Sequence, residues 1–518
     1  MQRLFKNGLG LLSLLSLTRT AASFSPPSLQ DCLTASSIPL DTPDSVFWNL
    51  DILPFNSLLP YTPAAVAVPT STPQIQAAIA CGVASGYKVS ARCGGHSYGS
   101  YGLGGEDGHL VIQLDRMYTV TLDMSNGTQR GIATAGPGTR LGHLASELWT
   151  QGGRAIAHGT CPGVGTAGHA LHGGFGISSH THGLALDWIS GLTVALANGS
   201  LVHCSATENT DLFWGMLGAG SNFGIVTEFE WNTFAPPSNL TWFSADLPWG
   251  LTAKNGKNVT IAGLEAVGEF ATSGSMPPEL NMRVVGTSVG ATQLEGLYYG
   301  DETELYGVLA PLLNVTGASL SQVQPTDWIG SLEQFAGTTN LDITWPYSSQ
   351  ETFHSNGLVL KSLKGQSAED FVDYWFSEAY SNTGSGSWYF QLDIQGGNTS
   401  AVTTNSKTGS NINTSSYAHR DKLYILSFFY QSSTTSVPSD AAAMIDGWAA
   451  ATTQSLSLEN GDWGMYINYP DLSLNRTMAQ ELYFGESLPR LKELKALYDP
   501  DEVFYYPVSV DPATGSGT

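Results

Sequence analysis

Two glycine-rich loops of the sequence each carry one nucleophilic side chain. Residues 92–102 spell RCGGHSYGSYG and contain His96, while residues 158–169 spell HGTCPGVGTAGH and contain Cys161. Dense glycine lets backbone N–H groups approach a ligand closely, and successive N–H groups in such turns suit a diphosphate. Taken singly, His96 could cap a turn and Cys161 could be inert. Together, the two loops indicate a cofactor site.

The second loop also contains the pattern G-x-G-x-x-G, at residues 163–168. A nicotinamide-type Rossmann site needs a strand before the glycines, a helix after them and an acidic residue about 20 positions further on, ending the next strand. Here residues 160–162 are typical of a loop, and Asp187 begins a predicted strand. Three more glycines over 173–176 weaken a crossover helix. We therefore reject the Rossmann interpretation.

The first loop follows a predicted β-α-β unit. We expect strands over 64–68 and 87–91 and, between them, a helix with Thr72 as N-cap and Pro73 at its first position. The apolar stripe of this helix consists of Ile75, Ile79 and Val83.

Further along, we expect a helix over 140–149, a hairpin over 193–204 with a two-residue turn at Asn198-Gly199, and a strand over 223–231. The run Ala235-Pro236-Pro237-Ser238 is typical of a domain boundary. Beyond it, strand-like aromatic runs alternate with helices up to about residue 460, which predicts an antiparallel sheet with helices on one face. A last helix spans 488–498, with Leu491, Leu494 and Leu497 on one side.

Composition narrows the function. With 518 residues, of which 42% are hydrophobic, the chain is long enough for two or more folded domains. Its net charge of -23 disfavours nucleic acid and anionic membranes as partners, because phosphate binding needs clustered Lys and Arg. We expect no metal in the site.

The N-terminus is typical of a secretory signal peptide over residues 1–23. Arg3 and Lys6 precede a short apolar run, and small residues follow at 21–23. We therefore expect a secreted, extracellular protein. Eight N-glycosylation sequons agree with this expectation. They lie at Asn126, Asn198, Asn239, Asn258, Asn314, Asn398, Asn413 and Asn475.

The chain has five cysteines, so at least one stays unpaired. Cys32 lies near the mature N-terminus and Cys81 on a predicted helix, and these two could form a disulfide. Cys161, between Thr160 and Pro162, is less expected in one.

The two loops resemble the flavin-attachment loops of the berberine-bridge-enzyme-like family, which belongs to the vanillyl-alcohol-oxidase-type flavoproteins. Within it, the chain is most similar to fungal gluco-, chito- and xylo-oligosaccharide oxidases, over about residues 32–510. Other matching stretches are GGEDGH at 104–109, THGL at 181–184, YAHRD at 417–421 and YINY at 466–469.

The resemblance implies an α+β, two-lobed fold. Residues 24–236 would form an FAD-binding domain of the PCMH type, and residues 237–460 a substrate domain with a large antiparallel sheet flanked by helices. Residues 461–510 would rejoin the FAD domain, leaving 511–518 as a tail.

It also implies bicovalent FAD, bonded at the flavin 8α-methyl by His96 and at C6 by Cys161. As nucleophile, the thiol needs thiolate character. Further cofactor-binding residues implied are Arg92, Gly94, Gly95, Ser97, Tyr98, Gly99, Ser100, Thr160, Gly165, Gly168, His169, Gly224, Ile225 and Val226.

The implied reaction oxidises a sugar's anomeric hydroxyl to a lactone, with a tyrosine base assisted by an aspartate. The matching residues are Tyr469 and Asp393. From the residues alone, core packing of Tyr469 and a strand-end turn at Asp393 are the favoured explanations, and the resemblance reverses this preference. Val164 matches the position that governs oxygen entry, and valine there favours an oxidase that releases hydrogen peroxide. We expect a monomer whose partners are a small carbohydrate and O2. Candidate residues of the sugar groove are Tyr98, Arg283, Tyr347, Tyr389 and Gln391.

Three positions depart from relatives. His172 replaces a usual glycine, Leu392 stands where a relative has tryptophan, and Val285 replaces an acidic or amide residue that helps to set sugar preference. These departures affect the choice of sugar more than the chemistry. Two alternatives remain: an FAD-linked oxidase of a secondary metabolite (alkaloid, terpenoid or polyketide), and a secreted carbohydrate-binding protein with an idle flavin.

Overall fold

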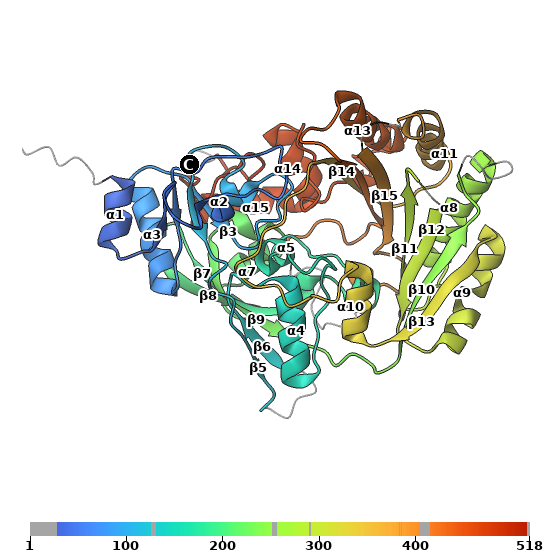
Figure 1. Cartoon of the computed structure of the whole chain (residues 1–518), viewed down its shortest axis with the longest axis horizontal. Coiled ribbons are helices and arrows are strands. Elements are labelled where there is room, and N and C mark those ends of the chain that lie inside the picture. The colour runs from blue at the N-terminus through green and yellow to red at the C-terminus, as the bar shows by residue number, and fades with distance from the viewer. Residues whose placement is uncertain are drawn as a thin grey trace, which may run out of the picture.

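The computed structural model describes residues 28–125, 131–250, 256–289, 292–382, 384, 386–404 and 415–514. It has two lobes (Figure 1). The first half of the chain forms one lobe with two sheets, and a single large sheet with helices forms the other. The expected signal peptide, Asn126 and Asn413 lie outside the described residues.

The first lobe begins with a four-stranded sheet in the order β1-β2-β4-β3. Strands β2, β4 and β3 are parallel, and β1 is antiparallel to β2. The strands are β1 (Leu40–Asp41), β2 (Ala65–Ala67), β3 (Val89–Arg92) and β4 (Leu110–Gln113). Helix α3 (Thr72–Ala84) connects β2 to β3, so the expected β-α-β unit is present, and β3 leads directly into the His96 loop.

A five-stranded antiparallel sheet, in the order β5-β6-β9-β7-β8, completes this lobe. Its strands are β5 (Val120–Asp123), β6 (Ile132–Ala135), β7 (Ile189–Ala195), β8 (Leu201–Ser205) and β9 (Ile225–Asn232). The Cys161 loop lies between β6 and β7, flanked by α4 (Leu141–Gly152) and α5 (Thr166–Ala170).

The second lobe is built on an eight-stranded antiparallel sheet, in the order β13-β10-β12-β11-β15-β16-β14-β17. Its strands are β10 (Leu240–Leu247), β11 (Leu280–Thr287), β12 (Thr292–Tyr298), β13 (Ser319–Thr326), β14 (Phe353–Leu360), β15 (Gly386–Ile394), β16 (Tyr424–Ser432) and β17 (Trp463–Gly464). The antiparallel sheet expected from the sequence is therefore confirmed.

Helices cover the outer face of this sheet, as Figure 1 shows for α8, α9, α11 and α13. Their bounds are α8 (Gly256–Thr272), α9 (Glu302–Thr316), α11 (Gln366–Tyr374) and α13 (Ser439–Thr453). The other helices are α1 (Leu29–Ala35), α2 (Trp48–Asp51), α6 (Ser179–His182), α7 (Thr210–Ala219), α10 (Trp328–Ala336), α12 (Ala401–Thr404), α14 (Arg476–Phe484) and α15 (Leu488–Tyr498).

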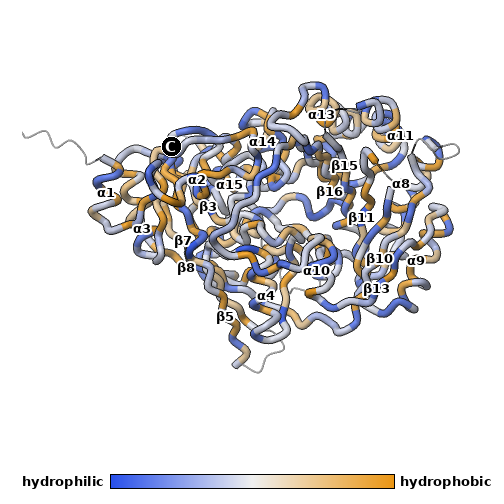
Figure 2. The backbone as a smooth tube through the Cα atoms, in the orientation of Figure 1, coloured by the Kyte–Doolittle hydropathy of each residue, from blue (hydrophilic) through white to orange (hydrophobic). Residues whose placement is uncertain are grey.

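Strand periodicity decides which side chains of β15 face the first lobe. Trp388, Phe390 and Leu392 are almost fully buried in the core beneath the helices. Because successive side chains of a strand point to opposite faces, Gln391 and Asp393 lie on the other face. The hydropathy pattern agrees, since hydrophobic segments run through the interior of both lobes (Figure 2).

The C-terminal segment returns to the first lobe. Helix α15 packs against α7, and the Val89 N–H donates to the Val503 carbonyl at 2.8 Å. The Val510 N–H also donates to the Asn222 side-chain oxygen at 2.7 Å. These contacts agree with a segment that rejoins the FAD-binding lobe, while the exact boundaries at 236 and 460 stay predictions.

Several local expectations need correction. Ser71, not Thr72, is the N-cap of α3, and Val83 is exposed. Leu497 is exposed as well, because α15 turns Lys495 inward to a buried ion pair with Asp499 at 2.6 Å. The β7–β8 loop has three residues, not two, because Leu196 N–H bonds to the Ser200 carbonyl and Gly199 takes the left-handed conformation.

Cys32 and Cys81 form the expected disulfide, which joins α1 to α3. In the part of the chain that the structure describes, no helix is long and apolar enough to cross a membrane.

Candidate active site

A cavity of about 340 Å³ lies between the two lobes. Both glycine-rich loops, strands β11 and β15, the start of β9 and the C-terminal segment line it. Most of the site residues expected from the sequence are among the lining residues. They are Arg92, Gly94, Gly95, His96, Ser97, Tyr98, Thr160, Cys161, Val164, Gly165, Gly168, His169, Gly224, Ile225, Val226, Arg283, Gln391, Asp393 and Tyr469.

The two loops contact each other through glycine. A Cβ on Gly94 would lie 2.2 Å from the Gly165 nitrogen, and a Cβ on Gly165 would lie 2.3 Å from the Gly94 nitrogen. Arg140, a buried side chain that sequence reasoning missed, joins the loops. Its Nη1 donates to the carbonyls of Gly94, at 2.8 Å, and Gly163, at 2.6 Å. His96 and Cys161 are therefore held at one place although 65 positions separate them.

The first turn of α4 fixes the Cys161 loop further. Backbone N–H groups at a helix start have no partner inside the helix. Here the Leu141 N–H donates to the Val164 carbonyl at 2.9 Å, and the Gly142 N–H donates to the Pro162 carbonyl at 3.0 Å. The backbone on both sides of Gly163 is thus anchored to a helix of the first lobe.

His96 is held as a neutral imidazole. Burial, and then the positive charges of Arg140 and Arg92, lower its pKa to about 3. Its ring stacks on Phe55, with ring centroids 4.4 Å apart, and its buried Nε2 has no hydrogen-bond partner among the described residues. A neutral imidazole retains a lone pair, as nucleophilic attachment to a cofactor requires.

Cys161 is exposed at the cavity, in contrast to the buried thiols of Cys93 and Cys204. Desolvation raises the pKa of the Cys161 thiol, although the backbone N–H groups of Gly163 and Val164 lower it. The protein surroundings alone therefore do not supply the thiolate character that its expected role requires.

Tyr469 and Asp393 meet at this cavity from different parts of the chain. Asp393 is buried on β15, directly opposite Arg283 on β11, and accepts a hydrogen bond from Gln391 Nε2 at 2.7 Å. Burial raises the pKa of Asp393 to about 6, despite the opposing effects of Arg283 and Gln391. Burial, followed by the charge of Asp393, raises the pKa of Tyr469 well above its ordinary value.

These shifts define what the pair can do. A free tyrosinate at Tyr469 is strongly disfavoured, so the phenol cannot act as a preformed base near neutral pH. Asp393, in contrast, titrates close to neutrality and can accept a proton. A relay in which the phenol oxygen takes a proton while its own proton passes towards Asp393 is consistent with both.

The segment before Tyr469 is docked onto the first lobe. The Tyr466 hydroxyl accepts hydrogen bonds from the N–H groups of Gly174, at 3.0 Å, and Phe175, at 3.2 Å. Asn468 donates to this hydroxyl at 2.9 Å and to the His169 carbonyl at 3.2 Å. The position of Tyr469 is thus set by the first lobe, which carries both glycine-rich loops.

The residues expected for the sugar groove divide into two groups. Arg283, Gln391 and Tyr98 line the cavity, with the Tyr98 ring stacked 5.8 Å from that of Tyr469. Tyr347 and Tyr389 are not among the lining residues. Tyr389 stacks on Phe429 at 5.1 Å.

Tyr347 covers the attachment loops. Its ring lies parallel to that of His96 at 6.1 Å, and the Arg140 guanidinium lies 4.7 Å from its centroid. Its hydroxyl would lie 2.4 Å from a Cβ on Gly163. These contacts hold Tyr347 against both attachment loops.

Two expected cofactor residues, Gly99 and Ser100, lie just behind the cavity. Ser100 is buried and takes the left-handed conformation at φ 52°, which turns the loop into a short helix. A Cβ on Gly99 would lie 2.5 Å from the Tyr101 ring. Both residues therefore shape the His96 loop rather than line the cavity.

The three departures occupy different places. Leu392 is buried in the core face of β15, so it does not share a face with Asp393. Val285 lies opposite Gln391 on the cavity side of β11. His172 lines the cavity, where its Nδ1 donates to the Gly168 carbonyl at 3.0 Å.

Because His172 Nδ1 is a donor and burial lowers the pKa of the ring, Nε2 must be an acceptor. This Nε2 is buried without a partner among the described residues. FAD offers matching donors, namely the flavin N3–H and the ribityl hydroxyls. The unpaired acceptor, the glycine-lined loops and the neutral His96 all fit FAD as the cofactor.

Asp187, the acidic residue that favoured the rejected Rossmann interpretation, has another role. It forms a buried ion pair with Arg420, in which the Arg420 Nη1 lies 3.1 Å from its Oδ2. Sequence reasoning also missed Arg140 and Phe55 in the site, and it gave no role to Asn468, although this residue belongs to the matching stretch YINY at 466–469. No local pattern singles out Arg140 or Phe55, because their roles depend on contacts with residues far away in the chain.

Comparisons with known proteins agree with this site. A family model for an FAD binding domain matches residues 63–205, and a model described as berberine and berberine like matches residues 465–511. The chain is 48% identical to xylooligosaccharide oxidase from Thermothelomyces thermophilus, over 94% of this chain and 95% of that protein. It is also 42% identical to the FAD-linked oxidoreductase dpmaF of Metarhizium anisopliae, over 94% and 92% of the two chains.

Solved structures show the same similarity. Xylooligosaccharide oxidase from Myceliophthora thermophila C1, in complex with xylobiose, superimposes with a TM-score of 0.89 at 46% identity, covering 94% of this chain and all of that one. Glucooligosaccharide oxidase from Acremonium strictum, with a 6-S-cysteinyl, 8α-N1-histidyl FAD, gives a TM-score of 0.87 at 39% identity, with coverage of 94% and 100%.

Proposed function

This chain belongs to the berberine-bridge-enzyme-like family of FAD-linked oxidases, and on that basis we propose that it oxidises the anomeric C1 hydroxyl of an oligosaccharide to the lactone. His96 and Cys161 hold the cofactor covalently. The observation that carries the proposal is the meeting of Tyr469 and Asp393 at the cavity that both attachment residues line.

FAD, when bound, accepts the hydride from the sugar carbon and passes the electrons to O2, which becomes hydrogen peroxide. The protein handles the proton. The Tyr469 oxygen takes the proton of the C1 hydroxyl, and Asp393 receives the phenol proton, so neither a free tyrosinate nor a free alkoxide is needed. Arg283, Gln391 and Tyr98 orient the sugar.

Arg283 has a second task. Its Nε bonds to Glu295 Oε1 at 2.6 Å, so a carboxylate on β12 holds the guanidinium. The charge of Arg283 in turn limits how far burial raises the pKa of Asp393. Arg283 therefore favours the ionised form of Asp393, which can accept a proton, whereas the charge of Glu295 raises the pKa of Asp393 and opposes this effect.

Val164 is the proposed control point for oxygen. It lines the cavity three residues after Cys161, and its carbonyl is fixed by the Leu141 N–H at 2.9 Å. With its backbone held by α4, only the size of this side chain adjusts the space near the attachment loop. Valine leaves more room than a bulkier residue would, which favours an oxidase.

A peroxide-coupled screen of reducing oligosaccharides tests the proposal, with the same sugars reduced to alditols as matched controls. An alditol lacks the anomeric hydroxyl, so peroxide should form with the sugars and not with the alditols. Equal rates with both would contradict oxidation at C1.

The second candidate is an FAD-linked oxidase of a secondary metabolite; the 42% identity to dpmaF, which is named only as an FAD-linked oxidoreductase, shows that relatives at this level of identity are not all named as sugar oxidases. It requires a substrate other than a reducing sugar, so inactivity towards every sugar of the screen would favour it. An idle flavin in a carbohydrate-binding protein does not explain why both Tyr469 and Asp393 reach the cavity.

The chain is also proposed to be secreted and N-glycosylated. The six sequon asparagines that the structure describes are all exposed, as attachment of a glycan requires. An endoglycosidase that leaves the apparent mass of the secreted protein unchanged would contradict this proposal.

A further inference from the structure

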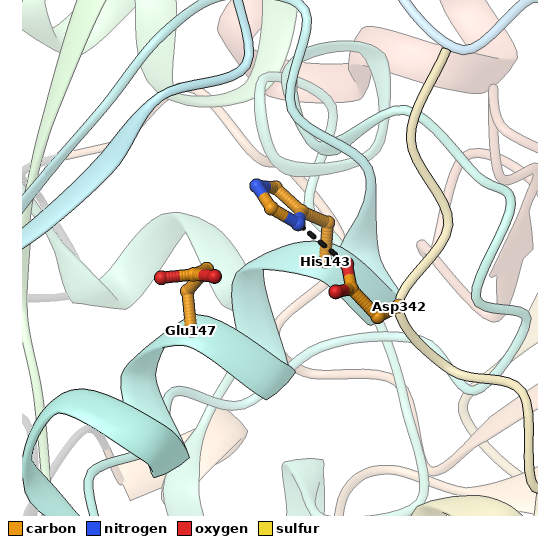
Figure 3. Close-up of side chains that lie close together, drawn as sticks. All are labelled: His143, Glu147 and Asp342. Atoms are coloured by element: carbon orange, nitrogen blue, oxygen red, sulfur yellow. Dashed lines mark hydrogen bonds and ion pairs between the residues drawn. The ribbon is translucent and has the colours of Figure 1, made fainter. Parts of the chain in front are cut away.

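A second cluster of chemically active side chains lies outside the cavity, on α4 and the segment after α10. His143 and Glu147, one turn apart on α4, face Asp342 on the segment that joins α10 to β14 (Figure 3). One nitrogen of His143 and one oxygen of each carboxylate all lie within 4.8 Å of one another. None of these three residues lines the flavin cavity.

The joining segment crosses from the second lobe to the first. Leu341 is buried in a cluster with Ala145 of α4, and its carbonyl oxygen lies 1.9 Å from where a Cβ on Gly142 would be. Further along, the Ser57 N–H donates to the Glu351 carbonyl at 2.8 Å. Asp342 is therefore brought to α4 by a well-anchored backbone, although its carboxylate is exposed.

The His143 ring is fixed so that one nitrogen faces the carboxylates. Nε2 lies 3.1 Å from the Tyr118 carbonyl, which can only accept, so Nε2 must carry the proton and donate. Nδ1 then faces Asp342 Oδ1 at 2.6 Å. Histidine ligands of metals are held in this way, with the second ring N–H on a carbonyl or carboxylate.

Glu147 is oriented from outside the cluster as well. Gln151, one turn further along α4, donates from Nε2 to Glu147 Oε2 at 2.7 Å. Because Gln151 bonds to Oε2, Oε1 of Glu147 is available to a cation. The donor set is therefore one imidazole nitrogen and two carboxylates, each side chain being held by a neighbour.

We propose that His143, Glu147 and Asp342 form a binding site for a divalent transition-metal cation, with Zn²⁺ as the best match. Zinc accepts histidine nitrogen and carboxylate oxygen, whereas Mg²⁺ and Ca²⁺ prefer oxygen alone. Bond lengths of about 2.0–2.1 Å place tetrahedral ligands about 3.3 Å apart. The present donor separations, from 2.6 Å to at most 4.8 Å, bracket that value.

Cation binding exchanges a proton for a metal without any redox change. A cation bound by both atoms replaces the 2.6 Å contact between His143 Nδ1 and Asp342 Oδ1. Any proton shared in that contact leaves to solvent, and the divalent ion offsets the two carboxylate charges.

A cation at this site would link α4 to the segment that joins α10 to β14, and both of these contact the glycine-rich loops. Helix α4 holds the Cys161 loop through the Leu141 and Gly142 N–H groups. The joining segment carries Tyr347 onto His96 and Gly163. A cation between α4 and this segment therefore stabilises both contacts at once. The sequence did not predict the cluster, because His143 and Asp342 are 199 positions apart.

Isothermal titration of the tag-free, metal-stripped holoprotein with Zn²⁺ tests the proposal. We expect one saturable site, a binding enthalpy that varies linearly with the ionisation enthalpy of the buffer because protons are released, and a higher melting temperature with Zn²⁺. Glu147→Gln and Asp342→Asn keep the size of each side chain and should weaken binding roughly tenfold or more, since even the partners of metal ligands contribute 10- to 100-fold.

His203→Gln is the matched control. His203 also contacts two glutamates, at 2.9 Å and 3.4 Å, but through different ring nitrogens, so one nitrogen cannot share a metal with both. This variant should bind Zn²⁺ like the wild type. Absence of Zn²⁺ binding by the wild type, unchanged binding by Glu147→Gln and Asp342→Asn, or equally tight binding of Mg²⁺ would each overturn the proposal. Circular dichroism and the flavin spectrum check that both variants fold.

Discussion

Gly94 and Gly165 lie backbone against backbone, so that a Cβ on either would approach the nitrogen of the other to within 2.3 Å. The contact joins the loop of His96 to the loop of Cys161. It also explains the G-x-G-x-x-G spelling of the second loop without a Rossmann site, since Gly165 is required by packing against the other loop.

The first prediction concerns Gly165→Ala. The new methyl group would overlap backbone atoms that cannot rotate away, so the loops must separate, at a cost of about 1–3 kcal/mol typical of overpacking. We expect a lower melting temperature and less bound flavin. Gly307→Ala, on α9 and with no atom within 4 Å of its Cβ, is the control and should melt like the wild type. Equal melting temperatures for both variants would contradict the packing role of Gly165.

The second prediction concerns the tethers. His96→Ala and Cys161→Ala should each keep one covalent bond, so the intact mass of each denatured variant should include one FAD. The double variant should show none. An FAD adduct on the double variant, or its loss from only one of the single variants, would contradict attachment through both side chains.

The third prediction concerns Tyr469→Phe. Removing the hydroxyl removes the group that takes the proton from C1, and general base catalysis typically contributes about 10²- to 10⁴-fold. We expect kcat to fall by that order, while the flavin spectrum stays unchanged. Tyr483→Phe is a suitable control, because the Tyr483 hydroxyl bonds to the backbone of Asp471. Retained turnover in Tyr469→Phe would remove Tyr469 from the mechanism.

The fourth prediction concerns pH. Burial raises the pKa of Asp393 to about 6, and the proton relay needs the ionised carboxylate. kcat/KM should therefore be constant at neutral pH and decrease as the pH falls through about 6, reaching roughly a tenth of its plateau one unit lower. Asp393→Asn should abolish this acid limb along with most activity. An acid limb that persists in the residual activity of Asp393→Asn would point to another group.

The fifth prediction concerns His172. Its Nε2 is a buried acceptor without a protein partner among the described residues, and we expect a hydrogen bond from FAD there. His172→Leu should lower the ratio of FAD to protein and shift the visible spectrum, and His172→Gln, with an acceptor of similar reach, should restore part of both. A leucine variant with full FAD and an unchanged spectrum would contradict the contact.

Local chemistry made much of the fold predictable. The Ser71–Pro73 start predicts α3 to within one residue, and alternation along β15 predicts which residues face the core. The errors arose at apolar residues that fit the core-facing stripe of a helix but can also lie at its surface. Val83 and Leu497 continue apolar stripes yet are exposed, which the spacing of apolar residues does not reveal.

Sequence motifs indicated His96, Cys161 and Tyr469 as site residues, and all three line one cavity. The sequence did not predict Arg140 and Phe55 as site residues, because each contacts a loop that is distant in sequence. Arg140 does so through two backbone carbonyls and Phe55 through a ring contact. The pKa shifts could not be predicted either, since desolvation depends on burial between two lobes. The raised pKa of Cys161 is the clearest case.

The most direct test of the central claim is to identify and count the products formed when the protein oxidises a reducing oligosaccharide. A reducing oligosaccharide should yield its lactone, detected by mass spectrometry as the lactone or the aldonic acid formed by hydrolysis. One molecule of hydrogen peroxide should form for each sugar oxidised and each O2 consumed. Peroxide formed without a C1-oxidised sugar, or oxidation at any other carbon, would contradict the account.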